Sequence, residues 1–335
     1  MKMTTQKNSL SLENSSKQEI LDAISVIIKE SKTFFIAGHT QPDGDAIGSG
    51  LALASLLKRL GKKVTHCSID TIAKDMMFIQ GVENIIHTNK VFENFDCAII
   101  LECIDFKRMG NIISPAQAKK IINIDHHLAH TNFGDVNYIV PNSSSVSELI
   151  YDIFINLKIV PNVEEAENLY IGLVTDTGRF QQLNTNSNSH LVAAELLKCG
   201  ANSSKLCKQI YSTMELSKIR LYGLALSNIE TAYNEKFVYI KLTKDIFSKA
   251  KATDTDTDGI INYCTSVPKA VVGCLLKEVD NNTTKLSFRS IEQFNLLDIV
   301  KNFNGGGHKN AAGCTLNTDI DTAAKTIILS LKGKL

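Results

Sequence analysis

The chain has 335 residues, of which 36 are Lys or Arg and 35 are Asp or Glu, so its formal net charge is +1. Hydrophobic residues make up 44% and charged residues 21% of the sequence, which is typical of a globular protein, here long enough for two domains. The balanced charge excludes a global electrostatic field for long DNA or an anionic membrane, so any contact with nucleic acid is expected to be local.

The cysteines and the apolar runs give an expectation about the cellular compartment. None of the eight cysteines belongs to a C-x-x-C pair, which favours reduced thiols over a disulfide framework or a zinc site. The first 17 residues contain no apolar leader segment, and no apolar run reaches the ~18 residues of a membrane span. We therefore expect a cytoplasmic protein without a membrane partner.

The first part of the chain alternates helical patterns with short apolar runs. Residues 16–30 carry apolar side chains at helical spacing, and a polar turn at 39–45 separates the first apolar strand from the next helix. Because each strand is apolar throughout, we predict a parallel α/β sheet with helices on both faces. The other predicted elements are strands 34–37, 63–69, 97–101 and 121–124 and helices 46–60, 145–155 and 163–174.

The remainder of the chain is predicted to be helical at first and then rich in strands. Residues 253–259 are predicted to be a helix N-cap loop, because position 12 from Asp254 is Thr265 and not the Glu of a calcium loop. The predicted helices are 187–198, 203–211 and 215–229, and the predicted strands are 236–242, 269–278 and 285–289. We divide the chain into a disordered N-terminus (1–16), a parallel-sheet domain (17–198), a helical connector (199–229) and a smaller α/β domain (230–335).

Polar side chains follow the first predicted strand directly. His39, Asp43 and Asp45 stand on a turn that Pro42 and Gly44 bend tightly. In open α/β sheets the binding site lies outside the carboxyl ends of the strands, so this turn can direct ligands into a crevice. The alternative is an Asp-rich turn in which Asp45 serves as the N-cap of the next helix.

Two further loops and one helix end add residues of the same type. Glu102 ends one apolar run, and Asp125-His126-His127 follows another. A carboxylate there is costly to bury unless it is paired or binds a metal; the alternatives are a solvated strand end and a chance pair of histidines. Asp176 ends a helical run, at the negative end of the helix dipole, where a cation would stabilise it.

Together these clusters place imidazoles and carboxylates at the strand ends of one sheet. Two divalent ions about 3.5–4 Å apart require such a set, with one carboxylate bridging the ions. Oxygen and imidazole ligands without thiolates favour Mn²⁺, with Mg²⁺ or Co²⁺ as alternatives.

A glycine-rich segment near the end of the sequence is a candidate phosphate site. Gly305, Gly306 and Gly307 would let backbone N–H groups approach an anion closely, and His308 adds a donor. The alternative is a flexible hinge. Arg289 could bind a phosphate through two parallel hydrogen bonds, or it could be an ordinary surface arginine.

In this order the motifs resemble those of the DHH phosphoesterase superfamily, which is named for the motif seen here as Asp125-His126-His127. The loop at 39–48 is similar to the first motif of the superfamily, Glu102 with Arg108 and Gly110 to the second, and residues 176–180 to the fourth. Residues 287–290 and 305–308 resemble the associated nucleotide-binding domain, DHHA1. The resemblance spans residues 20–330 and implies a parallel-sheet DHH domain followed by a smaller α/β DHHA1 domain.

The resemblance also implies roles for individual residues. His39, Asp43, Asp45, Glu102, His126 and Asp176 would bind two metal ions, and Arg108, Arg289, Ser290, Gly305, Gly306, Gly307 and His308 would bind the substrate. His127 would contact the scissile phosphate or protonate the leaving group, and Asp125 would orient it. The superfamily usually has Asp where this chain has Glu102, so the spacing or preference of the metals is expected to shift. Asp105 is an alternative ligand, but Glu102 directly follows the strand and keeps the spacing to Arg108.

The two-domain layout is similar to that of enzymes that degrade very short RNAs or 3′-phosphoadenosine 5′-phosphate (pAp). We therefore expect a two-metal hydrolase, an oligoribonuclease-like phosphodiesterase or phosphatase. Its substrates would be short oligoribonucleotides, dinucleotides such as pApA, or pAp, with no binding of long DNA; a homodimer remains open. The alternatives are a cyclic dinucleotide phosphodiesterase, a pyrophosphatase-like enzyme, a nucleotide-binding protein without catalysis and a metal-storage protein.

Overall fold

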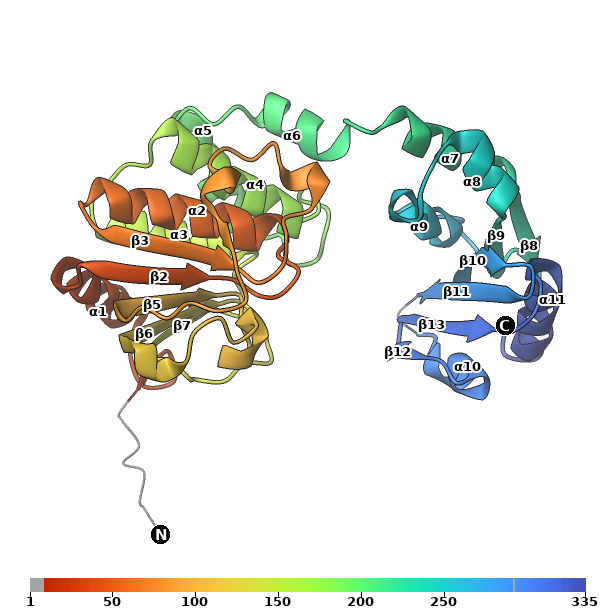
Figure 1. Cartoon of the computed structure of the whole chain (residues 1–335), viewed down its shortest axis with the longest axis horizontal. Helices are drawn as coiled ribbons and strands as arrows, with labels where there is room; N and C mark the ends of the chain where they lie inside the picture. Colours follow the sequence, from red (N-terminus) through yellow and green to blue (C-terminus); the bar gives the residue numbers. More distant parts are fainter. Residues whose placement is uncertain (1–8, 292) are drawn as a thin grey trace, which may run out of the picture. The chain divides into compact units, whose positions relative to one another are not determined.

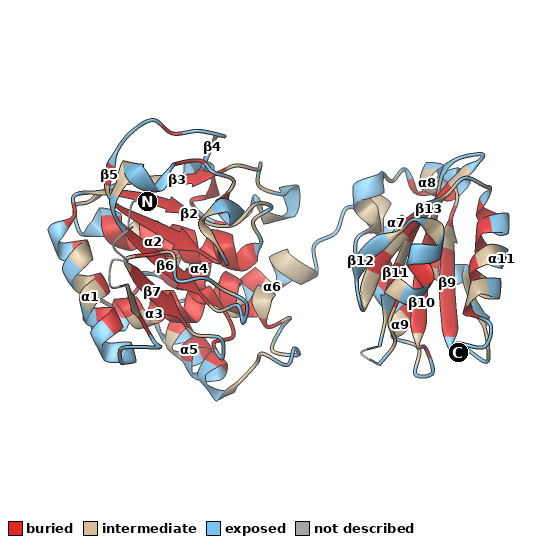
Figure 2. Ribbon diagram, turned by 90° about the horizontal axis from the view of Figure 1, so that it is seen from below, coloured by how far each residue is buried: buried red, intermediate tan, exposed pale blue. Residues whose placement is uncertain are grey.

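The computed structural model describes residues 9–291 and 293–335. These residues form two compact units, one ending at Thr213 and the other beginning at Met214 (Figure 1). Each unit has its own sheet and its own hydrophobic core, and Figure 2 shows the buried residues concentrated in the sheets and on the inner faces of the helices. None of the described helices is long and apolar enough to cross a membrane.

The first unit is built on a seven-stranded sheet in which neighbouring strands pair in parallel. This confirms the predicted parallel α/β sheet. Its order is β1-β7-β6-β5-β2-β3-β4, which brings together the ends of β6, β5 and β2, the strands that precede the polar clusters. The strands are β1 (Leu10–Ser11), β2 (Thr33–Ala37), β3 (Lys63–Ser68), β4 (Ile86–His87), β5 (Phe95–Leu101), β6 (Ala118–Asp125) and β7 (Val136–Ile139).

The ordered sheet begins earlier in the chain than expected. Strand β1 lies inside the segment 1–16 that the sequence predicted to be disordered, and Leu10 and Ser11 pair with β7. Residues 1–8 lie outside the described residues. The pairing gives β7 a neighbour on its outer side, so the edge of the sheet is the very short strand β1.

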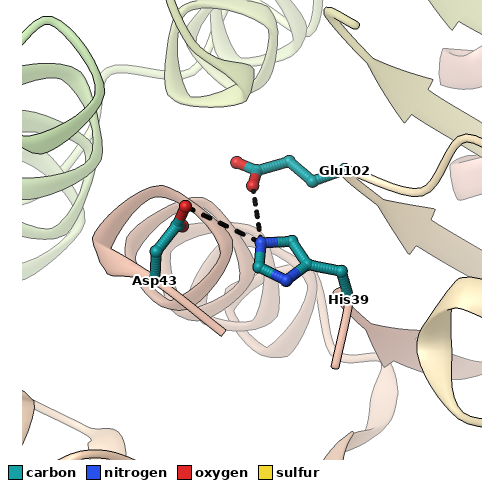
Figure 3. A group of neighbouring side chains, drawn as sticks. All are labelled: His39, Asp43 and Glu102. Atoms are coloured by element: carbon teal, nitrogen blue, oxygen red, sulfur yellow. Dashed lines mark ion pairs between the residues drawn. The ribbon is translucent and has the colours of Figure 1, made fainter. Parts of the chain in front are cut away.

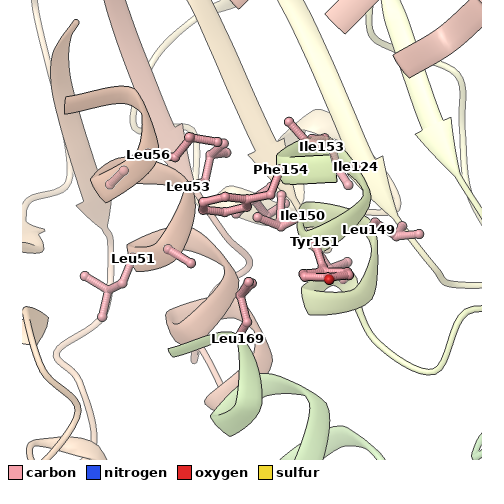
Figure 4. Close-up of a cluster of buried hydrophobic side chains, with 14 of the residues drawn as sticks. Leu51, Leu53, Leu56, Ile124, Leu149, Ile150, Tyr151, Ile153, Phe154 and Leu169 are labelled. Atoms are coloured by element: carbon pink, nitrogen blue, oxygen red, sulfur yellow. The ribbon is translucent and has the colours of Figure 1, made fainter. Parts of the chain in front are cut away.

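Helices cover one face of the sheet. The first of them, α1 (Lys17–Glu30), begins with a capping box in which Ser16 and Glu19 each bond the backbone N–H of the other. Buried residues of the helices form one core with Phe34 and Ile36 of β2, part of which is drawn in Figure 4. The other helices are α2 (Gly44–Arg59), α3 (Val146–Asn156), α4 (Val163–Asp176), α5 (Ser187–Lys198) and α6 (Ser203–Tyr211).

The opposite face is covered by turns in place of helices. Phe35 and Ile100 pack in a second cluster with Met109, which lies on the segment joining β5 to β6. Within the described residues this segment forms only the 3-10 turns η3 (Phe106–Met109) and η4 (Pro115–Gln117). Gly110, at φ 88°, ends η3, and a helix cannot run on through Pro115. The expectation of helices on both faces is therefore wrong for this face.

Glycines let α2 and α4 pack at close range. A Cβ atom on Gly48 would lie 2.2 Å from the Asn168 carbonyl oxygen, and one on Gly172 would lie 2.0 Å from Ser147 Oγ. Both distances are far shorter than van der Waals contact, so a larger residue would force the helices apart. The close approach holds Asp45, in the first turn of α2, against the N-terminus of α3.

The second unit contains a six-stranded sheet in the order β12-β13-β11-β10-β9-β8. Only β9 and β10 pair in parallel among these strands; the other pairs are antiparallel. One face packs on α10 (Leu297–Val300) and α11 (Ile320–Leu331), and part of the other face packs on α7 (Leu216–Ser227), α8 (Lys244–Ala250) and α9 (Ile260–Thr265). The strands are β8 (Ile229–Ala232), β9 (Phe237–Leu242), β10 (Val272–Asp280), β11 (Thr283–Ser290), β12 (Gly306–His308) and β13 (Ala311–Leu316).

The structure refines the sequence expectation for two segments. The proposed connector 199–229 is shared between the units, because α6 buries Leu206 in the first core and α7 buries Leu221 in the second. Residues 253–259 form the 3-10 turn η5 (Asp254–Thr257), and Thr253 caps this turn. The segment leads into α9 as an N-cap loop does, and the N-cap residue is Gly259, which offers no side-chain bond.

Candidate metal centre

The loops that follow β2, β5 and β6 meet at one edge of the parallel sheet, together with the end of α4. Their side chains form two groups, and within each group the ligand-type atoms lie within 4.8 Å of one another. The first group is His39, Asp43 and Glu102, and the second is Asp45, His126 and Asp176. The structure thus brings together all six residues for which the sequence suggested metal binding.

In the first group, one histidine nitrogen faces two carboxylates. His39 Nε2 lies 3.2 Å from Glu102 Oε2 and 3.7 Å from Asp43 Oδ2 (Figure 3). His39 Nδ1 lies 2.8 Å from the Thr40 carbonyl oxygen, so it carries a proton and donates it there. Burial would lower the pKa of His39, but the hydrogen bonds to Asp43 and Thr40 raise it overall. A positive charge, whether a proton or a metal ion, is therefore favoured between Nε2 and the carboxylates.

Asp43 is the N-cap of α2, which the sequence analysis had considered for Asp45. Its Oδ1 atom accepts hydrogen bonds from the N–H groups of Asp45 and Ala46, each at 3.0 Å. The other oxygen, Oδ2, is the one that faces His39. One carboxylate thus fixes the helix start and still offers a ligand atom.

Asp45 is buried and is held by the N-terminus of α3. Its Oδ2 accepts a hydrogen bond from the Val146 N–H at 2.5 Å, and its Oδ1 accepts from the Ser147 N–H at 2.9 Å and from Ser147 Oγ at 2.5 Å. The N-terminus of a helix favours a negative charge. The direction of the Asp45 carboxyl group is therefore fixed by α3 before any ligand binds.

Glu102 has an unusual backbone conformation and a buried, incompletely hydrogen-bonded carboxyl group. Its φ of 53° is left-handed, a conformation that costs ~1–3 kcal/mol for a residue other than glycine. The side chain is only 3% exposed, and Oε1 has no hydrogen-bond partner among the described residues. Burial raises the pKa of Glu102, and the nearby carboxylates of Asp45, Asp43 and Asp176 raise it further. This crowded carboxyl group belongs to the first group and adjoins the second, and a bound cation would relieve its cost.

The neighbours of Glu102 have other functions. Asp105 caps η3 by accepting hydrogen bonds from the N–H groups of Lys107 and Arg108, which supports the choice of Glu102 as the ligand. The Arg108 carbonyl oxygen accepts a hydrogen bond from the Thr40 N–H at 2.9 Å. This bond ties the loop after β5 to the loop that carries His39, and the Arg108 side chain is exposed.

The three residues after β6 are fixed by different partners. His126 Nδ1 lies 3.1 Å from the Ser143 carbonyl oxygen, and its Nε2 lies 3.6 Å from Asp176 Oδ2. His127 Nδ1 lies 2.6 Å from Asp125 Oδ1. This hydrogen bond raises the pKa of His127, although burial of the ring opposes the rise. His126 thus directs Nε2 towards Asp176, whereas the ring of His127 is held by Asp125.

Asp176 closes the second group from the end of α4. Burial and the carboxylate of Asp45 raise the pKa of Asp176 to about 7, although His126 opposes the rise. A carboxylate with this pKa is poorly stabilised in the metal-free protein. A cation bound in the second group would favour the ionised form of Asp176.

The residues that orient the candidate ligands were not predicted from the sequence. Ser143 and Ser147 contact His126 and Asp45 from the start of α3, and Gly172 leaves the space that Ser147 occupies. The run Ser-Ser-Ser-Val-Ser at 143–147 is visible in the sequence. Its partners lie far away along the chain, so the sequence alone gives no reason to select it.

The candidate substrate residues lie in the second unit, at the ends of β11 and β12. Arg289 is exposed, and its Nη1 donates to the Phe288 carbonyl oxygen at 3.1 Å. Ser290 Oγ donates to the Phe294 carbonyl oxygen and accepts from Asn310, so it serves the fold as well. Together with Ser287 and Gly313, the exposed Arg289 lines an open hollow of about 390 Å³.

The glycine-rich segment at 305–307 lies in and beside a strand of the sheet, and does not form a free loop or a hinge. Gly306, Gly307 and His308 make up edge strand β12, which pairs with β13. A Cβ atom on Gly305 would lie 2.5 Å from the Gly313 carbonyl oxygen, and Gly307 has a φ of 136°. These positions need glycine for close backbone packing. Gly306 and Gly307 also line the hollow beside Arg289.

Comparison with known proteins identifies the family. The model of the DHH family, N-terminal domain, matches residues 33–173, and the model of the DHHA1 domain matches residues 234–333. One match falls in each unit. The chain therefore belongs to the DHH superfamily of phosphoesterases, and within it to the members that carry a DHHA1 domain.

Individual relatives are similar over both units. The chain is 29% identical over 302 residues to the bifunctional oligoribonuclease and PAP phosphatase NrnA of Thermus thermophilus, with 90% of each chain covered. It is 27% identical to the protein of the same name from Bacillus subtilis, with 90% of this chain and 93% of that protein covered. The crystal structure of an exopolyphosphatase-related protein from Bacteroides fragilis is similar with a TM-score of 0.81 at 28% identity, covering 95% of this chain and 98% of that chain.

Proposed function

We propose that this phosphoesterase hydrolyses short oligoribonucleotides, dinucleotides such as pApA, and pAp. The names of the two NrnA relatives support this choice of substrates. The observation that carries the proposal is the buried Glu102 carboxyl group, with one unpartnered oxygen among the described residues, beside two groups of histidine and carboxylate ligands. Such a centre suits a phosphate ester, whose reaction develops negative charge on oxygen.

Two divalent cations fit these ligand groups, and oxygen with imidazole nitrogen favours Mn²⁺. The Nδ1 atoms of His39 and His126 both face carbonyl oxygens, which leaves Nε2 of each as the ligand atom. His39, Asp43 and Glu102 would hold one ion and Asp45, His126 and Asp176 the other. When bound, such a pair lowers the pKa of a water molecule and offsets the charge on the phosphoryl oxygens.

His127 is proposed to give a proton to the leaving oxygen. Asp125 holds its Nδ1, and the side chain is 47% exposed, so Nε2 is free to face a substrate. The raised pKa of His127 keeps the ring protonated closer to neutral pH. A general acid is most effective when its pKa lies near the working pH.

The second unit is proposed to hold the part of the nucleotide away from the scissile bond. The Arg289 guanidinium group is exposed beside the hollow lined by Gly306 and Gly307. Guanidinium groups bind phosphate through two parallel hydrogen bonds. Gly306 and Gly307 have no side chains, so a ligand can approach the sheet closely there. His308 is exposed at the end of the same edge strand.

The proposal is tested with one panel of substrates in the presence of Mn²⁺. The panel contains pAp, pApA, RNAs of two to five nucleotides, cyclic di-AMP and inorganic pyrophosphate. We expect hydrolysis of pAp and the short RNAs, loss of all hydrolysis after chelation and dialysis, and recovery when Mn²⁺ is restored. Hydrolysis of cyclic di-AMP or pyrophosphate alone would contradict the proposal, as would full turnover in excess chelator.

A further inference from the structure

The outer strand face of the second unit carries a second cation beside Arg289. Lys285, Ser287 and Arg289 alternate along β11, so their side chains project from the same face of the sheet. The intervening Leu286 and Phe288 are buried in the core beneath the opposite face. Lys285 and Arg289 therefore flank Ser287 on one surface, at a Cα separation of roughly 13 Å by strand rise.

Small residues make this surface hollow between the two cations. Ser287 is paired with Gly313 of β13, and Gly313 is paired with Gly306 of β12. The hollow of about 390 Å³ beside Arg289 continues into a second one of about 330 Å³, because Lys285 and Ser287 line both. The second hollow is bounded on its other side by Thr255 and Thr257, by Asp258, and by Asp254, which forms an ion pair with Lys277.

Lys285 differs from the lysine opposite it. Lys277 on β10 is paired with Lys285 across the strands, and its ammonium group forms an ion pair with Asp254 of η5. No carboxylate among the described residues forms an ion pair with Lys285, whose side chain is exposed at the junction of the two hollows. An unpaired cation on the wall of a polar hollow is suited to bind an anion.

We propose that Lys285 forms a second phosphate subsite, which binds one phosphate group of an oligoribonucleotide while Arg289 binds another. The inference rests on the proposed function and deepens it by naming the substrate class. A chain of three or more nucleotides reaches both cations, whereas pAp, with a single nucleoside, reaches only Arg289. The hydroxyl groups of Thr255 and Thr257 line the second hollow and would face the riboses of the longer chain.

The test measures binding in an Asp43→Asn background, so that substrate is not consumed. Fluorescence anisotropy with Mn²⁺ gives the Kd of a labelled RNA trinucleotide, and competition gives the Kd of pAp. Three variants are compared with the parent: Lys285→Ala, Lys285→Arg and Lys325→Ala. Lys325 is an exposed lysine of α11, on the opposite face of the same sheet, and so serves as the matched control.

We expect Lys285→Ala to weaken trinucleotide binding about tenfold or more, as for the loss of one charged hydrogen bond. The binding of pAp should change less than about twofold, Lys285→Arg should restore most of the affinity, and Lys325→Ala should resemble the parent. The slope of log Kd against log salt for the trinucleotide should fall by about 0.7 in Lys285→Ala, the value for one phosphate contact to a single strand.

Two results would contradict the proposal of a second phosphate subsite at Lys285. One is an equal loss for pAp and the trinucleotide, which would mean that Lys285 and Arg289 share one phosphate. The other is a Lys285→Ala variant that resembles Lys325→Ala on both ligands. A parent that binds neither ligand would instead contradict the proposed function, so the two failures are distinguishable. Unchanged melting temperatures show that the variants remain folded.

Discussion

Asp43 and Asp45 stand two residues apart and are stabilised by different helices. Asp43 caps its own helix with one oxygen and directs the other towards His39. Asp45 is buried, and both of its oxygens accept hydrogen bonds from the start of α3. The backbone of its own helix therefore fixes the direction of the Asp43 carboxylate, whereas a segment far away along the chain fixes that of Asp45.

Replacing Asp43 by Asn should abolish hydrolysis while the protein stays folded. Asn caps a helix as well as Asp does, but a neutral amide is a weaker partner for a cation than a carboxylate. Asp43→Ala should lose activity and also about 1 kcal/mol of stability, since the cap is lost too. Turnover at saturating Mn²⁺ and thermal unfolding of both variants check this, and near-normal turnover of Asp43→Asn would show that Asp43 is not a ligand.

Ser147 is expected to position Asp45 for metal binding. Ser147→Ala removes the 2.5 Å hydrogen bond to Asp45 Oδ1, and loss of such a supporting bond lowers metal affinity about 10–100-fold. The control is Ser49→Ala, because Ser49 is also buried but its hydroxyl group donates to the backbone carbonyl oxygen of Asp45 and not to the carboxylate. Calorimetric titration with Mn²⁺ measures both affinities. Equal affinities in the two variants would leave Ser147 with a packing role only.

The raised pKa of Asp176 predicts how the metal-free protein responds to pH. Burial and Asp45 raise the pKa from 3.8 to about 7, so between these values the folded chain holds a proton that the unfolded chain releases. Stability should therefore fall as pH rises through this window. Melting temperatures of the chelated protein from pH 4 to 8 should show the fall, and Asp176→Asn should reduce it. If the melting temperature of the parent did not change with pH in this window, the raised pKa of Asp176 would be contradicted.

At the level of elements, close helix packing holds the centre together. Gly48 and Gly172 lie where α2, α3 and α4 meet, and neither has room for a Cβ atom. Asp45 and Asp176 stand on α2 and α4 and share one ligand group. The distance between these helices therefore determines the geometry of the second group.

Gly172→Ala should destabilise the first unit and weaken metal binding. The added Cβ atom would lie 2.0 Å from Ser147 Oγ, and relief of such overpacking typically costs about 1–3 kcal/mol. Gly223→Ala is the control, for which we expect the opposite change in the free energy of unfolding. Gly223 lies in α7, and no atom is found within 4 Å of its Cβ position. There, alanine should stabilise the helix by roughly 0.5–1 kcal/mol. Chemical denaturation measures the free energy of unfolding of both variants. An unchanged free energy in Gly172→Ala would mean that the helices can move apart without cost.

At the level of the whole molecule, ligand-type residues and substrate-type residues are divided between the units. The metal ligands belong to the first unit, and Arg289 with the hollow beside β12 belongs to the second. Binding energy from a remote part of a substrate helps only when the substrate has that part. The division therefore predicts different behaviour towards large and small esters.

Arg289→Ala should impair nucleotide hydrolysis far more than hydrolysis of bis-p-nitrophenyl phosphate. A lost charged hydrogen bond costs about 1.5–3 kcal/mol, or roughly one to two decades in kcat/KM. The small ester has no nucleoside for the second unit to hold, so its kcat/KM should remain close to that of the parent. Equal losses on both substrates would indicate that Arg289 acts on the metal centre or on the fold.

Much of the first unit follows from local patterns. The apolar runs that became β2, β5 and β6 predicted a parallel sheet, and the helical spacing of apolar side chains predicted α1. Their order placed polar clusters at strand ends, so the ligand candidates could be chosen from the sequence. Strands as short as β1 and β4, with two residues each, carry too little pattern to be recognised.

Other features depended on contacts between distant parts of the chain. The sequence could not show that Asp43 caps α2 while Asp45 is held by Ser147, or that the glycines at 305–307 pack in and beside an edge strand. Nor could it show that Lys285 stands opposite Lys277, or that Asp254 forms an ion pair with Lys277 while no described carboxylate forms one with Lys285. Local propensity and spacing act over a few residues, whereas hydrogen-bond partners and unpaired charges are selected by the packing of segments that meet only in the folded chain.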